Sequence, residues 1–302
     1  MNLSLGQLSA LSRLAHLGTM TAVAEELGYT PGAVSQQIAA LEKTVKAPLI
    51  TKNGRKVALT DAGRVLVEHA DTLLVAERAA LDAVRNVQQH FVGPVSIGVF
   101  GSIAATLLPE VIAQARADYP QMRIRSCELD LDDVFDAVDR GYVDVAFGLD
   151  YPAVPFRKPD GVEIIVLRRE RFALAVAPGA YGLTEDSRID LRDAADWDWI
   201  LPVESEHYGL AMRTACRQYG FEPRVAHEVL DTAATLAMVA RGLGVSPATD
   251  IMLTLSSLPV ARVAIAQDVL REVVLIRPAA TNQRPTIEAI TEAARHLIKQ
   301  TP

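Results

Sequence analysis

The sequence of 302 residues has few cysteines, few aromatic residues and no long hydrophobic run. Two cysteines, Cys127 and Cys216, are too few for a disulfide framework, and neither lies in a CxxC or Cys/His cluster typical of zinc sites. No apolar run approaches the ~20 residues that a membrane helix requires, and the N-terminus lacks a signal-peptide pattern. We therefore expect a cytoplasmic protein that uses no metal or cofactor and has no membrane role.

Motifs of the common enzyme classes are missing as well. The sequence contains no GxSxG, P-loop or HExxH motif and no pair of carboxylates at a catalytic spacing. His207 is an isolated histidine, and such residues more often make a local hydrogen bond than catalyse a reaction. With 50% hydrophobic and 22% charged residues, the chain can form two or three folded domains. The composition favours a globular protein, and the missing motifs favour one without a catalytic site.

Charge is distributed unevenly along the chain. The formal net charge is -7, yet residues 29–64 contain six Lys or Arg against two Asp or Glu. A compact basic segment inside an acidic protein indicates a small module that binds a polyanion, joined to a larger domain with another task.

Two short helices separated by a glycine are predicted within this basic region. Gly28 can end the first helix, and Thr30 followed by Pro31 is a favourable start for the second. This layout is that of a helix-turn-helix, with an ordinary helical hairpin as the alternative. In a helix-turn-helix, the start of the second helix would read DNA bases, through Thr30, Pro31, Gly32, Ser35 and Gln36.

Residues 49–60 read as two short strands around Asn53-Gly54, a strong hairpin signal. Cations cluster at its tip, which is typical of a wing that lies on the DNA backbone; a solvated surface hairpin is the alternative. The wing residues expected to contact phosphates are Lys52, Arg55 and Lys56, and Asn53 is a further DNA-binding candidate.

A long helix without glycine or proline is predicted from 65 to about 90, with Asp61 as its cap. Apolar residues recur along it at alternating spacings of four and three, which favours packing on a second copy of the helix over cover by the chain's own later domain. The expected dimer seam contains Leu66, Ala70, Leu73, Ala80 and Val84. A dimer would also match a palindromic DNA site.

Beyond Gly93-Pro94, strands and helices alternate in a βαβαβ pattern that is followed by a second such unit. This pattern predicts mostly parallel sheets covered by helices. Ligands of open parallel sheets bind at the carboxyl ends of the strands.

The segments AVAEELGYTPGAVSQQIAALEKTV and PLITKNGRKVALTDAG resemble the DNA-binding domain of LysR-type transcriptional regulators. FGSIAATLLPEVIAQARADYP, LDDVFDAVDRGYVDVAFG and DTAATLAMVARGLGVSPA resemble the effector-binding domain of the same family. The resemblance implies a multidomain fold, in which an all-α winged helix-turn-helix head and a long linker helix precede an α/β two-subdomain periplasmic-binding-protein-like (type II) domain.

The resemblance also implies domain boundaries. The DNA-binding domain would span 1–60 and the dimerisation linker helix 61–92. Subdomain I would comprise 93–165 and 268–302, and subdomain II 166–267, with crossovers near 164–167 and 266–270.

A small metabolite would bind in the cleft between the subdomains. The family places an effector-contacting serine or threonine where Ser102 stands, although a plain helix cap would suit this serine equally. Further strand-end residues expected in the cleft are Asp130, Leu131, Pro202, Val203 and Glu204. Acidic side chains there, Glu206 included, disfavour a polyanionic effector.

We therefore expect a LysR-type regulator that binds double-stranded promoter DNA as a homodimer or homotetramer and responds to a small metabolite. The alternative is a small-molecule-binding or enzymatic α/β protein with an oligomerising helical head that does not read DNA.

Overall fold

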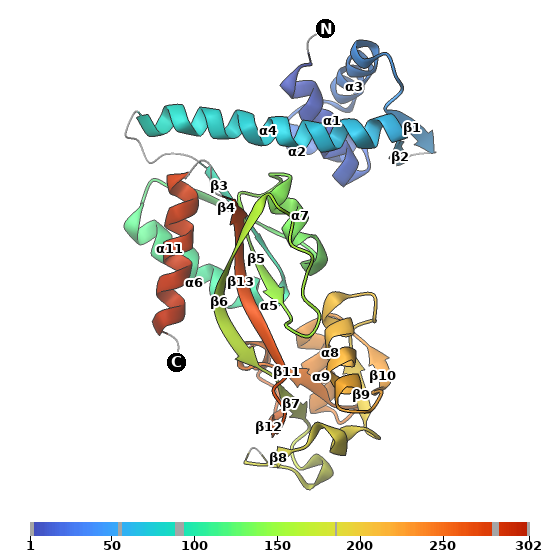
Figure 1. The fold of residues 1–302 in the computed structure, drawn as a ribbon, viewed down its shortest axis with the longest axis vertical. Helices are drawn as coiled ribbons and strands as arrows, with labels where there is room; N and C mark the ends of the chain where they lie inside the picture. The colour runs from blue at the N-terminus through green and yellow to red at the C-terminus, as the bar shows by residue number, and fades with distance from the viewer. Residues whose placement is uncertain (1–2, 54–55, 88–93, 185, 280–283, 301–302) are drawn as a thin grey trace. The chain divides into compact units, whose positions relative to one another are not determined.

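The structure, a computed structural model, describes residues 3–53, 56–87, 94–184, 186–279 and 284–300. The chain divides into two compact units, one that extends to His90 and one that comprises most of the remainder. Figure 1 shows the elements of both units.

The first unit contains the predicted helix-turn-helix and wing. Its elements are α1 (Leu5–Leu17), α2 (Met20–Leu27), α3 (Pro31–Val45), β1 (Ile50–Asn53), β2 (Lys56–Leu59) and α4 (Asp61–Val87). Gly28 ends α2 with a φ of 69°, in the left-handed region that favours glycine. Thr30 caps α3, because its Oγ1 accepts the Ala33 N–H at 3.2 Å. The local signals that predicted these two helices are confirmed.

Two local details in this unit differ from the expectation. Thr60 rather than Asp61 caps α4, since the Thr60 Oγ1 accepts the Gly63 N–H at 3.0 Å and Asp61 is already helical. Asn53 pairs with Lys56 in the antiparallel β1–β2 register, so Asn53 belongs to the strand instead of the turn.

The first lobe of the second unit is a five-stranded sheet in the order β4-β3-β5-β13-β6. Strands β3 (Pro94–Val99), β4 (Arg123–Glu128) and β5 (Val145–Asp150) are parallel, and β13 (Leu270–Pro278) runs antiparallel to both β5 and β6 (Val162–Arg171). The helices are α5 (Gly101–Ala105), α6 (Leu107–Asp118), α7 (Val134–Asp139) and α11 (Pro285–Gln300), with a 3-10 turn, η1, at Leu131–Asp133. Helices α6 and α11 lie side by side (Figure 1).

The second lobe contains two small sheets. A four-stranded sheet has the order β11-β7-β12-β8, and β9 pairs in parallel with β10. The strands are β7 (Ala173–Val176), β8 (Arg188–Ile189), β9 (Asp198–Leu201), β10 (Arg224–Glu228), β11 (Ser246–Ala248) and β12 (Ala261–Ile265). The helices are α8 (His207–Gln218), α9 (Thr232–Ala240) and α10 (Asp250–Leu253), with 3-10 turns η2 (Ala180–Gly182) and η3 (Leu191–Ala194). One continuous hydrophobic core extends through both lobes.

Strands β6 and β13 lie side by side and lead from one lobe to the other (Figure 1). The return crossover lies between Ile265 and Leu270, within the predicted segment. The first crossover comes later than predicted, because β6 stays paired with β13 as far as Arg171 and β7 begins at Ala173. Hydrophobic periodicity locates a strand but does not show where the chain leaves one sheet for the next.

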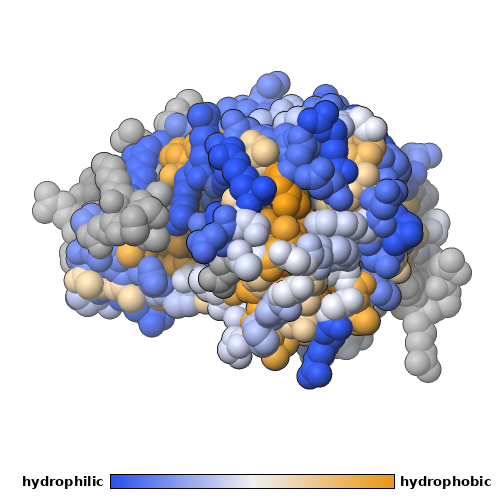
Figure 2. Space-filling view, turned by 90° about the horizontal axis from the view of Figure 1, so that it is seen from below, coloured by the Kyte–Doolittle hydropathy of each residue, from blue (hydrophilic) through white to orange (hydrophobic). Residues whose placement is uncertain are grey.

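Hydrophilic residues dominate the face seen in Figure 2, where hydrophobic residues form a narrow strip and smaller patches. Among the described residues, no helix combines the length and the apolar character needed to cross a membrane.

Candidate functional site

The start of α3 presents an exposed polar face. All five residues predicted to read bases are exposed: Thr30, Pro31, Gly32, Ser35 and Gln36. The opposite face is fully buried in the core of the first unit, through Val34, Ile38 and Leu41. Because that face anchors the helix, the exposed face is free to enter a DNA groove.

The wing is attached to α3 by Glu42. Its Oε1 accepts the backbone N–H groups of Leu49 at 2.8 Å and Ile50 at 3.3 Å. No motif in the sequence indicates this role of Glu42, and none singles out Tyr29, which is 49% exposed beside the start of α3. The side chains of the predicted wing contacts lie outside the described residues: Lys52, Asn53, Arg55 and Lys56.

Helix α4 divides its apolar stripe between two environments. Ala70 is fully buried in the core of its own unit, and Leu66 is partly buried against that core. The expectation that Ala70 contributes to a dimer seam is therefore corrected, since no surface of it is available to a second chain. Leu73 is 45% exposed and Ala80 is also exposed, whereas the side chain of Val84 lies outside the described residues.

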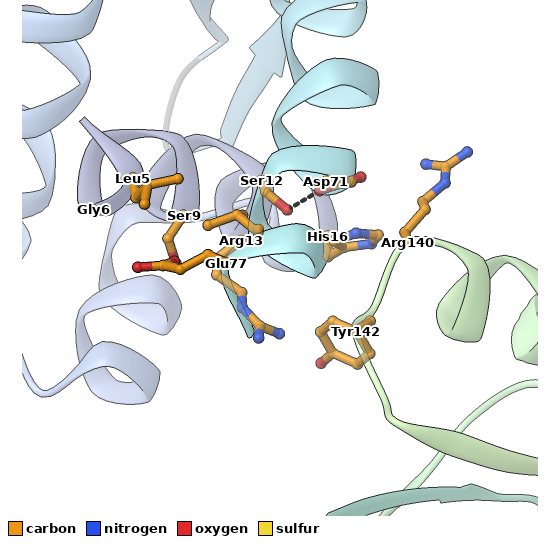
Figure 3. Close-up of a pocket in the computed structure, with 11 residues that line it drawn as sticks. Leu5, Gly6, Ser9, Ser12, Arg13, His16, Asp71, Glu77, Arg140 and Tyr142 are labelled. Carbon is orange, nitrogen blue, oxygen red and sulfur yellow. Dashed lines mark hydrogen bonds between the residues drawn. The ribbon is translucent and has the colours of Figure 1, made fainter. Parts of the chain in front are cut away.

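A buried hydrogen bond explains why one side of α4 faces the unit's own core. The Ser12 hydroxyl of α1 donates to Asp71 Oδ1 of α4 at 2.6 Å, and both residues are buried (Figure 3). The heptad-like pattern alone could not reveal that α1 covers this side.

The second unit contains a cavity of about 840 Å³ that is lined by both lobes. Three of the predicted cleft residues line it: Ser102, Asp130 and Leu131. The other three, Pro202, Val203 and Glu204, do not, and their places on the second lobe are taken by Glu206, Tyr208 and residues 230–233.

The end of β9 turns away from the cavity because it is bound to α8. The buried Arg213 guanidinium donates to the Pro202 carbonyl at 2.6 Å, and Arg217 forms an ion pair with Glu204 at 2.8 Å. Gly209 packs so closely that an added Cβ would lie 2.1 Å from the Val203 oxygen. The expectation that the residues after β9 form the opposite wall is thus corrected.

Arg271 lies in the wall of the cavity and is only 2% exposed. Its Nε donates to Glu170 Oε2 at 2.7 Å, and its Nη2 donates to Thr249 Oγ1 at 2.7 Å. Because Arg271 on β13 is the direct partner of Glu170 on β6, the ion pair joins the two strands that lead between the lobes. No sequence pattern indicates this pair, because its members are far apart in the chain.

Two tyrosines complete the interior of the cavity. Burial raises the pKa of both Tyr151 and Tyr208, so each phenol stays protonated. The Tyr208 hydroxyl donates to the Pro247 carbonyl at 2.8 Å. The Tyr151 hydroxyl lies near Arg271 but makes no hydrogen bond, although Tyr151 is completely buried.

Carboxylates gather where the two lobes meet. Burial raises the pKa of Asp132, although its Oδ2 accepts the His207 N–H at 3.3 Å. Burial and the neighbouring aspartates also raise the pKa of Glu206. The His207 ring bonds to the Val154 carbonyl at 2.5 Å and stacks on Phe156, which is the local role expected of a lone histidine. In the described part of the chain, no cluster of three His, Cys, Asp or Glu side chains is arranged to hold a metal ion.

Comparison with known families and proteins agrees with this geometry. Residues 5–64 match the family model "Bacterial regulatory helix-turn-helix protein, lysR family", and residues 88–298 match "LysR substrate binding domain". A probable cat1 operon transcriptional activator from Acinetobacter lwoffii is 29% identical over 227 residues, 74% of this chain and 73% of that protein.

Solved structures show the same fold at lower identity. Full-length OxyR from Pseudomonas aeruginosa is 19% identical, with a TM-score of 0.69 over 97% of this chain and 98% of that one. Full-length CbnR in complex with its target DNA is 22% identical, with a TM-score of 0.65 over 97% of this chain and 99% of that one.

Proposed function

The chain belongs to the LysR family of transcriptional regulators, and from this premise we propose which of its residues bind DNA, a second copy and an effector. It is a DNA-binding regulator with an effector-binding domain, and such regulators bind promoter DNA, oligomerise and respond to small molecules. The alternative, an α/β protein whose helical head does not read DNA, is not favoured, because the helix-turn-helix family model matches the head. Since the relatives are transcriptional regulators, we also propose a non-enzymatic role in the cytoplasm.

We propose that α3 enters the major groove, and the exposed polar face of that helix is the observation that carries this assignment. Gln36 can donate to and accept from an adenine edge, and Pro31 can pack on a thymine methyl group. Ser35 is exposed on the same turn. In the wing, Lys52, Asn53, Arg55 and Lys56 contact phosphates and thereby position α3 without reading sequence.

The effector site, in this proposal, is the cavity between the two lobes of the second unit. Both lobes contribute to its walls, so a ligand that contacts both walls changes the balance between open and closed arrangements. Ser102, Asp130 and Leu131 provide contacts from the first lobe. Coupling of this kind typically amounts to roughly 1 to 3 kcal/mol, enough to change promoter occupancy.

Two substitutions in the first unit separate base reading from backbone contact. Binding is measured on a duplex that the wild-type protein enriches from random DNA and on a scrambled duplex of the same composition. Gln36→Ala should relax specificity at one base position, at a cost of roughly 1 to 3 kcal/mol on the enriched duplex alone. Arg55→Ala should weaken binding to both duplexes and lower the salt slope by about one.

Gln114→Ala, a glutamine substitution on α6 of the second unit, provides the matched control and should bind both duplexes like wild type. Equal losses on the two duplexes for both test variants would contradict the assignment of α3 as the reading helix.

A further inference from the structure

The cavity is strongly acidic. Five carboxylate side chains line it against a single arginine: Glu128, Asp130, Asp132, Glu206 and Asp231. They come from both lobes, with Glu128, Asp130 and Asp132 at the end of β4 and in η1, and Glu206 and Asp231 before α8 and α9. A ligand between the lobes is therefore surrounded by negative charge.

These carboxylates have no cationic partner in the described part of the chain. Asp231 caps α9 through the Ala234 N–H at 2.7 Å, and Asp132 accepts one backbone N–H, but none of the five forms an ion pair with a described side chain. Elsewhere in the same lobe, Arg217 pairs with both Glu204 and Glu222. Carboxylates of this lobe outside the cavity are thus ion-paired, whereas the five in its lining are not ion-paired with any described side chain.

The positive charge of Arg271 is countered by Glu170, whose Oε1 also lies 3.8 Å from Arg168 Nε. Both Glu170 and Arg271 are buried, and the Arg271 Nε and Nη2 atoms each lie 2.7 Å from Glu170 Oε2. Its Nη1 donates to the Met252 sulfur at 3.4 Å. Because a buried guanidinium paired with a buried carboxylate has little charge to offer an incoming anion, the net field in the cavity remains that of the carboxylates.

One hydroxyl group in the lining has no hydrogen-bond partner among the described residues. Tyr151 is completely buried, and its hydroxyl bonds to no described group. Ser102, which is 6% exposed, also lines the cavity. Since an unpaired buried hydroxyl is costly, Tyr151 points to a ligand that supplies the missing hydrogen bond.

The electrostatic state of the acids is consistent with a cationic ligand. Burial raises the pKa of Asp132, and the nearby Asp133 and Asp130 raise it further. Glu206 is affected by burial and by the same aspartates. A positive group placed among them would relieve this mutual repulsion, whereas an anion would increase it.

We propose that the cavity binds a small organic cation with at least one protonated amine. Its ammonium group lies against Asp132 and Glu206, and a second polar group of the ligand hydrogen-bonds to the hydroxyls of Tyr151 and Ser102. This inference rests on the proposed function of the cavity as the effector site and assigns the chemical class of that effector.

Small probes of different charge test the proposal, and three of them share a chain of four methylene groups: butane-1,4-diamine, adipate and butane-1,4-diol. Butane-1,4-diamine, agmatine and arginine are the cationic probes, adipate is the dianionic probe, and butane-1,4-diol is the neutral one. Binding of each to the full-length protein is measured by calorimetry and thermal shift in buffered physiological saline. We expect at least one cationic probe to bind, and adipate and the diol not to bind.

Three variants locate the bound cation. Asp132→Asn should weaken binding of the cationic probe by about tenfold or more, as the loss of a charged hydrogen bond predicts. Tyr151→Phe removes a hydroxyl that has no partner in the free protein, so it should weaken ligand binding without lowering the unfolding temperature. Glu110→Gln, an exposed site on α6 outside the cavity, makes the same change in net charge as Asp132→Asn and should bind like wild type.

The outcomes distinguish an error in the charge of the ligand from an error in the location of the site. Binding of adipate instead of the cations, abolished by Ser102→Leu, would overturn the cationic class and leave the effector site in place. Cation binding that is unchanged in both Asp132→Asn and Ser102→Leu would overturn the proposed site itself. Failure of every probe to bind would overturn the assignment to small amines.

Discussion

At the scale of single residues, Thr30 and Gly28 delimit helices of the first unit, and Arg271 joins two strands of the second. Thr30 and Gly28 are identified by their immediate neighbours, and the structure confirms both caps. Arg271 and Glu42 form their decisive contacts with residues on other elements. A sequence without those contacts gives no reason to distinguish such side chains from surface charges.

Cys216 shows how burial lowers the reactivity of a thiol. Cys216 is buried in the second lobe, and burial raises its pKa to about 12, well above the usual thiol range. At neutral pH almost none of it is thiolate, which is the form that reacts.

We therefore predict that Cys216 resists alkylation in the native protein. Iodoacetamide at neutral pH should leave the Cys216 peptide unmodified in the folded chain and label it fully in denaturant, as read by mass spectrometry of the digested protein. The denatured sample is the control for reagent and peptide recovery. Native labelling as rapid as labelling in denaturant would show that the thiol is accessible.

At the scale of elements, periodicity and turn chemistry predicted the types and order of most helices and strands. The structure corrects them where two elements compete for one face. The apolar stripe of α4 fits a dimer seam by its spacing, yet α1 covers Ala70. Arg213 of α8 donates to the Pro202 carbonyl after β9, and Pro202 and Val203 do not line the cavity. Such competition is decided by tertiary packing, which no single segment encodes.

The junction between the wing and α4 depends on a close approach at Gly63. An added Cβ would lie 2.2 Å from the Leu49 carbonyl oxygen, which is backbone and cannot move aside cheaply. Gly63→Ala should destabilise the protein by about 1 to 3 kcal/mol, as overpacking does. Urea unfolding followed by circular dichroism measures this change.

Gly6→Ala is the matched control in α1, because its added Cβ would have no neighbour closer than 3.8 Å. Alanine is the better helix former, so Gly6→Ala should be neutral or slightly stabilising. Equal stability of the two variants would contradict the close approach at Gly63.

At the scale of the whole molecule, a DNA-reading unit is joined to a ligand-binding unit, and a two-fold DNA site requires a second copy of the chain. Exposed apolar residues on α4 remain candidates for that contact, in particular Leu73. Because Leu73 is 45% exposed, a charge at this position is tolerated by the isolated chain but not in an apolar seam.

Leu73→Asp should therefore make the protein monomeric and weaken operator binding, while the fold of each chain persists. Sedimentation velocity gives the mass, and circular dichroism checks the fold. Thr72→Asp adds the same charge to the neighbouring exposed position and should sediment like wild type. A Leu73→Asp protein that sediments like wild type and binds its operator would place the seam elsewhere.

Selection from a pool of random DNA duplexes tests whether α3 reads base sequence. The wild-type protein is incubated with the pool, and bound duplexes are sequenced after several rounds. The account predicts enrichment of one motif with two-fold symmetry, which disappears when the selection is repeated with Gln36→Ala and Ser35→Ala combined. Recovery of the pool without any enriched motif would contradict the claim that α3 reads base sequence.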